Sequence, residues 1–337
     1  MTKRIKTVIQ YLLVIGLTVF LVWFSLRSVK TGQDQNKWEY ILDTWGMADK
    51  GWLMMMALIA MISHVLRAER WRMLMEPTGH RITLFNSFIS LMIGYLVNLV
   101  IPRGGEVSRC YNLYKLDNSP VEVSFGTVVV ERGIDLLCFI LIVGIAFLVE
   151  TEKLFTFINT LPLSKAAGLD KMITLSIAIV GLLVVGVISY LLIKRNTRVK
   201  NKIRKVWIGF KDGLSAVFRL KQKNLFVFYS VMIWFLYFLM SYAAIQTFEE
   251  LSHLGWTAVL ALFAIGSLAM VLPLPGGTGA YHTLVPTGLV FLYMVPQSEA
   301  VAFTFIFHGW QTLIMVAGGV FGLISTYIIV MRRKPVS

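Results

Sequence analysis

The sequence predicts an all-α polytopic membrane protein with about six full spans plus two re-entrant helical hairpins in an inverted repeat. Three observations indicate this class. The 337 residues are 57% hydrophobic and only 15% charged, whereas soluble domains are about half apolar and a quarter charged. Apolar runs close to the length of a bilayer crossing recur along the chain. Two similar proline-glycine stretches interrupt these runs, as in transporters built from inverted repeats.

Nine apolar runs define the expected elements. They are 8–27, 51–66, 83–101, 124–149, 172–193, 225–247, 256–272, 283–295 and 299–331. No polar segment between them is long enough to hold a soluble core. The first run is too long for the apolar part of a signal peptide, so we expect an uncleaved span. The whole chain, 1–337, is then a single transmembrane domain, with a first half of about 1–150 and a second half of about 172–331.

Basic residues orient these runs, because cytoplasmic loops are enriched in Lys and Arg. The N-terminus begins MTKRIK, and the segment 194–224 carries eleven Lys and Arg residues. Both are cytoplasmic if 83–101 enters the membrane and 105–120 turns back to the same side. The run 256–272, which leads into PLPGG, then enters from the opposite side. This arrangement places the protein in the inner (cytoplasmic) membrane with both termini and the basic loop in the cytoplasm.

Each proline-glycine stretch is expected at the tip of a hairpin. Non-helical backbone at membrane depth is tolerated only where protein buries it or where it lines a wet cavity. We therefore expect the two hairpins to meet and to enclose a cavity near the midplane. The alternative is that both stretches are ordinary interfacial loops.

The first tip, NLVIPRGGEVSR, carries Arg103, Glu106 and Arg109 after Asn98. Glycines let a backbone approach a ligand closely. A helix beginning here would offer its N-terminus, beside Arg103 and Arg109, to a phosphate. The alternative is a turn whose charged side chains extend to the membrane interface.

The run 124–149 contains three charged residues, Glu131, Arg132 and Asp135, in an otherwise apolar helix. A charge at membrane depth costs about 2.5–3.5 kcal/mol on insertion scales. These residues are therefore expected in a buried network with Arg103 or Arg109. The alternative is an ion-pair staple between helices. Arg67 and Arg70 are expected to be interface anchors that could also meet a lipid phosphate.

The second tip carries Gly276, Gly277 and His282, and the last run carries His308 and Gln311. Two histidines in such segments are candidate proton carriers or phosphate donors. The alternative is hydrogen-bonded packing.

Several classes of function lack their sequence signals. No P-loop, zinc-protease or nucleophile-elbow motif is present, so we expect no enzyme activity, no cofactor and no metal. The two cysteines form no CxxC pair. The net charge of +14 falls in a few loops and indicates orientation and anionic lipid rather than nucleic acid.

The motif order NLVIPRGGEVSR, VVVERGIDLL, PLPGGTGAYH and FHGWQTL resembles the lysylphosphatidylglycerol synthase transmembrane region, or flippase-like domain, family. The resemblance runs from about Arg67 to the end. Some members carry a soluble domain that charges lipid headgroups, and none follows here, so the resemblance implies lipid translocation rather than synthesis. The family's motifs fall on Asn98, Arg103, Glu106, Arg109, Glu131, Arg132, Asp135, Gly276 and Gly277. Many members have Glu where this chain has His282 and Arg where it has His308, which suggests that these two positions face one another.

The expected function is translocation of a phosphate-bearing lipid, either a phospholipid or a polyprenyl-phosphate carrier. Arg103 and Arg109 would hold the phosphate. The alternative is a membrane-embedded enzyme acting on a lipid-linked phosphate, with Glu106 or His282 as acid or base. A scaffold that transports nothing is a third reading. The expected partners are membrane lipids, with a separate lipid-modifying enzyme or glycosyltransferase as a further candidate.

Overall fold

The computed structural model describes residue 23 and residues 37–160, 197–272 and 274–333, and all regular structure in these ranges is helical. The expected spans 8–27 and 172–193 and the start of the basic segment lie outside the described residues. Among the described residues, four helices are long and apolar enough to cross a membrane: Lys50–Thr78, Val121–Val149, Lys223–Gln246 and Gln297–Arg332. The prediction of a multi-pass helical membrane protein is confirmed.

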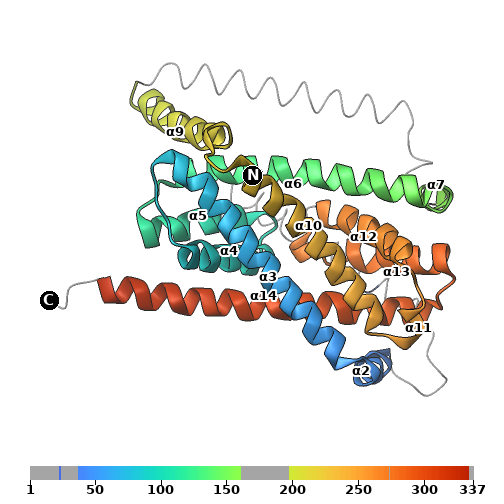
Figure 1. Ribbon diagram of the computed structural model, residues 1–337. Helices are drawn as coiled ribbons and strands as arrows, with labels where there is room; N and C mark the ends of the chain where they lie inside the picture. Colours follow the sequence, from blue (N-terminus) through green and yellow to red (C-terminus); the bar gives the residue numbers. More distant parts are fainter. Residues whose placement is uncertain (1–22, 24–36, 161–196, 273, 334–337) are drawn as a thin grey trace, which may run out of the picture.

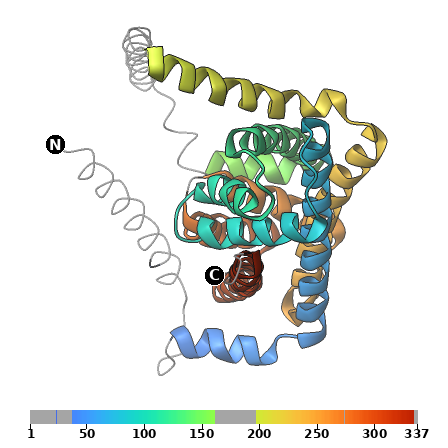
Figure 2. The same cartoon turned by 90° about the vertical axis from the view of Figure 1, so that its left-hand side faces the viewer.

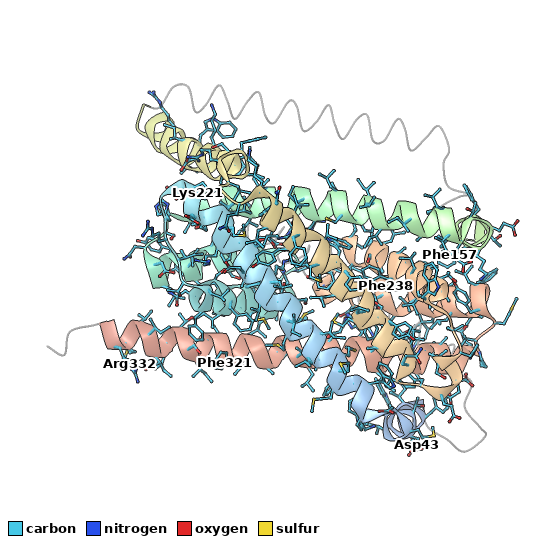
Figure 3. All side chains as sticks on the ribbon, viewed as in Figure 1. Asp43, Phe157, Lys221, Phe238, Phe321 and Arg332 are labelled. Atoms are coloured by element: carbon cyan, nitrogen blue, oxygen red, sulfur yellow. The ribbon has the colours of Figure 1, made fainter. Side chains whose placement is uncertain are left out.

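Helices α3 (Lys50–Met75) and α10 (Lys223–Gln246) pack side by side in opposite directions (Figure 1). At one end the Asp49 amide donates to the Thr247 carbonyl over 2.9 Å. At the other, Lys221 pairs with Glu76 of η1 (Glu76–Thr78) at 3.4 Å. We call the end with Lys221 the α9 end and the opposite one the α11 end. In Figure 3, Lys221 lies toward the left and Asp43 of α2 (Lys37–Met47) toward the right.

Helix α6 (Val121–Val149) runs from the α9 end to the α11 end, and α7 (Thr151–Thr160) follows it. Part of the basic segment, expected as a loop, forms α9 (Thr197–Ser215) and η2 (Ala216–Arg219). Two glycines explain how α9 packs on the start of α6. A Cβ at Gly126 would overlap the Phe210 carbonyl, and a Cβ at Gly213 would overlap the Val123 carbonyl. Only glycine allows the two backbones to lie this close.

The first expected hairpin is formed by α4 (Leu84–Asn98) and α5 (Gly104–Asp117). Asn86 donates to Asp117 over 2.8 Å at its open end. Asn112 donates to Ser90 over 2.9 Å further in. Because α6 begins four residues after α5 ends, the open end of this hairpin lies at the α9 end.

The second hairpin consists of α12 (Trp256–Val271), η3 (Pro275–Gly277) and α13 (Ala280–Tyr293). Its open end lies at the α11 end, where α11 (Glu249–Ser252) precedes α12 and Lys153 of α7 lies 4.8 Å from the Tyr293 ring. The two hairpins therefore enter from opposite ends, and Figure 1 shows them in opposite halves of the molecule.

The hairpin tips touch each other. Arg103 Nη2 donates to the Val271 carbonyl over 3.3 Å. A Cβ at Gly276 would lie only 2.9 Å from Leu99 Cδ2. The hairpins therefore meet as expected, but the pocket described below is lined by α4, α5 and α6 and not by the second hairpin.

Helix α14 (Gln297–Arg333) extends along both hairpins, packing on α13 and α4 (Figures 1 and 2). Its 37 residues span about 55 Å, longer than the hydrocarbon core of about 30 Å. Three glycines of α14 face α4. A Cβ would meet Met92 at Gly318, Leu96 at Gly319 and the Ile89 carbonyl at Gly322.

One expected boundary is wrong. The predicted run 51–66 stops where the first arginines follow it, but α3 continues to Met75. Arg67 and Arg70 are therefore buried in the helix instead of lying in a loop at the interface. They are tolerated because carboxylates of α6 neutralise them.

Candidate functional site

Buried charges from α3, α5 and α6 form one ion-pair network. Glu131 of α6 has no exposed surface and lies 2.9 Å from Arg67 and 3.1 Å from Arg109. Asp135, one turn later, lies 2.8 Å from Arg67 and 2.6 Å from Arg70. Glu131 lies ten residues after the start of α6, about 15 Å along its axis. The acids of α6 thus pair with Arg109, as expected, and with two arginines of α3.

Arg132 and Glu106 extend the network toward its exposed edge. Arg132 lies 3.2 Å from Glu106 of α5 and 3.6 Å from Asp135. The Arg132 side chain is 41% exposed, whereas Arg109 is only 2% exposed. The network therefore runs from a closed interior to an accessible edge.

Neighbouring polar and aromatic groups orient the arginines. Tyr237 of α10 accepts from Arg67 over 3.1 Å, and Ser230 accepts from Arg70 over 3.3 Å. The Trp71 ring lies 4.7 Å from the Arg109 guanidinium carbon, a cation–π contact. Because groups on several helices fix these side chains, the site is pre-organised.

A small, closed pocket lies beside this network. Its lining comes from α4, α5 and α6 and consists of Leu91, Gly94, Tyr95, Asn98, Gly105, Glu106, Arg109 and Arg132. In this conformation the pocket is closed, with no space for even a water-sized group between the three helices.

Several buried polar atoms of the pocket residues have no hydrogen-bond partner among the described residues. They are Nε and Nη2 of Arg109, Nε of Arg132, Oε2 of Glu106 and the Tyr95 hydroxyl. An unpartnered buried polar group costs about 1–3 kcal/mol, and more when it is charged. Unpartnered buried polar atoms in a native structure are explained by strain, by bound water, or by a bound ion or ligand.

Helix α5 begins at Gly104, as expected, but its glycines serve packing. A Cβ at Gly105 would overlap the Gly94 carbonyl and lie 2.7 Å from the Asn98 side chain. Asn98 Oδ1 accepts from the Gly105 amide over 2.7 Å. Packing against α4 therefore requires glycine at position 105, and Gly105 also lines the pocket.

Arg103 stands apart from the ion pairs described above. It is exposed, has a φ of 60°, and donates to Val271 of the other hairpin. A left-handed conformation costs an L-residue about 1–2 kcal/mol. The structure therefore places Arg109, rather than Arg103, beside the α6 acids and the pocket.

The two histidines lie together in the second hairpin region. The rings of His282 and His308 are 4.8 Å apart, so these positions face one another as expected. His308 Nε2 lies 3.0 Å from the Gly276 carbonyl, and the Gly279 amide lies 3.4 Å from His282 Nδ1. These contacts hold the tip, which the packing alternative also explains. Gly277 is buried at the same tip, and Gln311 is half-buried on α14, one turn after His308.

Arg67 and Arg70 were expected as interface anchors that could meet a lipid phosphate, and not as partners of the α6 acids. A signal for them is present in the sequence, because arginines three apart on one apolar helix match carboxylates four apart on another. In an α-helix both spacings place the two side chains on one face.

Comparison with known proteins places the sequence among membrane proteins. Residues 8–319 match the family described as the lysylphosphatidylglycerol synthase TM region. A UPF0104 membrane protein of Methanothermobacter thermautotrophicus is 24% identical over 78% of this chain and 82% of that protein.

Two further relatives are similar over less of their own length. A UPF0104 membrane protein of Methanocaldococcus jannaschii is 31% identical over 25% of this chain and 26% of that protein. The protein named glycosyltransferase AglD of Haloferax volcanii is 23% identical over 96% of this chain, which spans 56% of that relative. No solved structure matches the chain.

Proposed function

Because the chain belongs to the lysylphosphatidylglycerol synthase TM region family, we propose that it moves a phosphate-bearing lipid across a membrane and catalyses no reaction. The observation that carries this proposal is the pocket with unpartnered Arg109 and Arg132 donors beside a buried ion-pair network. Retaining such charges among apolar helices is costly, and they typically mark substrate pathways.

The proposed topology has six spans and two re-entrant hairpins in an inverted repeat, all in one transmembrane domain. Four spans are helices of the structure, and 8–27 and 172–193 would supply the others. The hairpins, which enter from opposite ends and touch at their tips, support this arrangement.

The proposed location is the inner (cytoplasmic) membrane, with both termini and the α9 end in the cytoplasm. The α9 end carries Lys221 and Arg332, both on the left in Figure 3. The acidic pair Glu249 and Glu250 lies on α11, at the opposite end. Cytoplasmic loops are the ones enriched in Lys and Arg, so the charge distribution supports this orientation.

In the proposed mechanism, the headgroup phosphate occupies the pocket while the acyl or prenyl chains remain in the bilayer. Arg109 and Arg132 donate to the phosphate, and Glu131 and Asp135 hold the arginines in place. Rocking of the two halves about the hairpin tips would expose the pocket to either side of the membrane. In the structure the pocket is closed, so we assign this conformation to an unloaded state between the two open ones.

A lipid-scrambling assay tests the proposal. Purified protein is reconstituted into vesicles containing a fluorescent phospholipid, and the fraction accessible to an external quencher is followed. We expect Arg109→Gln to abolish the protein-dependent scrambling. The matched control is Arg72→Gln, since Arg72 pairs with Glu69 on an exposed face of α3. Equal scrambling by the two variants would reject the assigned role of Arg109.

A membrane-embedded enzyme acting on a lipid-linked phosphate is the second candidate, favoured by the similarity to a protein named as a glycosyltransferase. Glu106, whose Oε2 is unpartnered, would then act as acid or base. Turnover of a lipid phosphate or a lipid-linked sugar by the purified protein would support the enzyme and contradict pure transport.

A further inference from the structure

Helix α9 (Thr197–Ser215) lies across the direction of the long apolar helices. Figure 2 shows α9 along its length, whereas α14, one of the helices long enough to cross a membrane, is seen end-on. The short helix η2 joins α9 to α10, a second such helix, which begins at Lys223. Because α9 ends only a few residues before this start, it lies at the level where a bilayer passes from hydrocarbon to headgroups.

The composition of α9 is typical of a helix that binds a membrane surface. Its sequence, TRVKNKIRKVWIGFKDGLS, contains six Lys and Arg residues and one acid, Asp212. Asp212 pairs with Arg219 of η2. Arg204 and Lys211 are exposed, and neither forms an ion pair with another described residue. Interfacial helices combine basic residues of this kind with Trp, Phe and Leu.

Two glycines fix which side of α9 faces outward. A Cβ at Gly209 would lie 2.5 Å from Glu122 Cγ, and a Cβ at Gly213 would lie 3.0 Å from the Gly126 Cα. Any rotation of α9 about its axis would turn larger side chains into this narrow contact with α6. The opposite side of α9 is therefore held away from α6.

Large apolar side chains are exposed along one side of α9. Trp207, whose ring lies 5.7 Å from the Phe210 ring, is 60% exposed. Leu214 lies on the same face, two turns later, and Phe218 of η2 is 79% exposed. Asp212, five positions after Trp207, lies about 140° away around the helix. The helix thus has an apolar side and a polar side.

We propose that α9 is an interfacial helix that binds the anionic lipid surface of the leaflet at the α9 end. Trp207, Leu214 and Phe218 enter the headgroup region, where a bilayer accepts amphipathic and apolar rings. Arg204 and Lys211 extend to lipid phosphates. This binding needs no transport, so the inference goes beyond the proposed function and does not depend on it.

Position and charge favour a membrane over an acidic protein as the occupant. The bilayer around α6 and α10 already reaches α9, because α9 packs on the first turns of α6 and leads through η2 into α10. Each Lys or Arg near an anionic surface strengthens binding by a factor of about five. Six such residues along one helix suit an extended charged surface better than a single binding site.

Fluorescence quenching on the full chain tests the proposal. Cys110 and Cys138 are replaced by alanine, and one cysteine is introduced by Phe218→Cys or, as the matched control, by Asp212→Cys. Each is labelled with nitrobenzoxadiazole and placed in nanodiscs of phosphatidylcholine with or without phosphatidylglycerol. Quenching is measured with aqueous iodide and with a phospholipid spin-labelled near the top of its acyl chain.

We expect phosphatidylglycerol to increase lipid quenching at position 218 several-fold and to lower iodide quenching there, while the label at position 212 stays accessible to iodide. At the phosphatidylglycerol content that gives half of this change, Arg204→Gln/Lys211→Gln should lower the ratio of membrane-bound to free α9 about 25-fold. The control Lys153→Gln removes an exposed cation from the α11 end and should leave the ratio unchanged.

A salt titration repeats the test without substituting any basic residue. Because salt screens exposed charges, raising the salt concentration should reverse the lipid quenching at position 218. Lipid quenching that is equal with and without phosphatidylglycerol, or that high salt leaves unchanged, overturns the proposal because charge then plays no part. Protection from iodide without lipid quenching also overturns it, since a protein surface would then cover this side of α9.

Discussion

Replacing Glu131 by glutamine tests the buried network most sharply. Glu131 lies 2.9 Å from Arg67, 3.1 Å from Arg109 and 3.7 Å from Arg70, with no exposed surface. Glu131→Gln removes the negative charge that all three arginines share. It also places the N–H donors of the new amide against the N–H donors of the arginines. Removing one partner of a buried ion pair costs about 3–5 kcal/mol, so we expect a loss of this size in the free energy of unfolding. Equilibrium unfolding in mixed micelles, titrated with sodium dodecyl sulfate, measures it.

A second carboxylate at the end of α6 provides the control. Glu150 pairs with Lys153 at 3.0 Å, and the side-chain exposures are 12% for the glutamate and 45% for the lysine. Because the lysine keeps its contact with solvent when the glutamate is neutralised, Glu150→Gln should cost well below the roughly 3–5 kcal/mol expected at Glu131. The double variant Glu131→Gln/Arg109→Gln should lose less than the sum of its single variants, by about 0.5–3 kcal/mol. Equal costs for Glu131→Gln and Glu150→Gln would refute the reasoning.

Three further pairs of substitutions test the packing around the hairpins, each by the same unfolding measurement. Gly105→Ala should destabilise by about 1–3 kcal/mol because its Cβ overlaps α4, whereas Gly133→Ala, with nothing within 4 Å, should stabilise α6 by up to about 1 kcal/mol; the reverse order would contradict the assigned contact. Arg103→Gly should be about 1 kcal/mol more stable than Arg103→Ala, because only alanine is strained at a φ of 60°; equal stabilities would argue against that backbone. His308→Phe should cost about 1–3 kcal/mol by leaving the Gly276 carbonyl unpartnered, and His308→Gln should cost less; an equally damaging glutamine would exclude the hydrogen bond as the cause.

Much of the fold could be predicted because hydrophobic length and proline-glycine punctuation determine it. The run 83–101 became α4, and 256–272 became α12, each within about three residues. The reversal of chain direction after Val100 followed from the distribution of basic residues alone. These features are local, and the bilayer constrains them strongly.

The site was harder to predict because its partners are distant in sequence. Arg67 and Glu131 are 64 residues apart, and without the fold an arginine after an apolar run indicates an interface. Arg103 and Arg109 lie on one motif, yet the left-handed backbone at Arg103 directs them to different surroundings. The fate of a charge at a helix end depends on whether a second helix brings a counter-charge, which composition does not reveal.

The contact between the hairpin tips offers the most direct test of the account. Leu99→Cys and Gly276→Cys are combined in a chain whose own cysteines, Cys110 and Cys138, are replaced. A Cβ at Gly276 would lie 4.0 Å from the Leu99 Cα, within reach of a disulfide. We predict that mild oxidation in membranes cross-links this pair within one chain, that the cross-link stops lipid scrambling, and that reduction restores it. Absence of the cross-link, or full scrambling by the cross-linked protein, would contradict the claim that two opposed hairpins meet and move to carry a lipid headgroup.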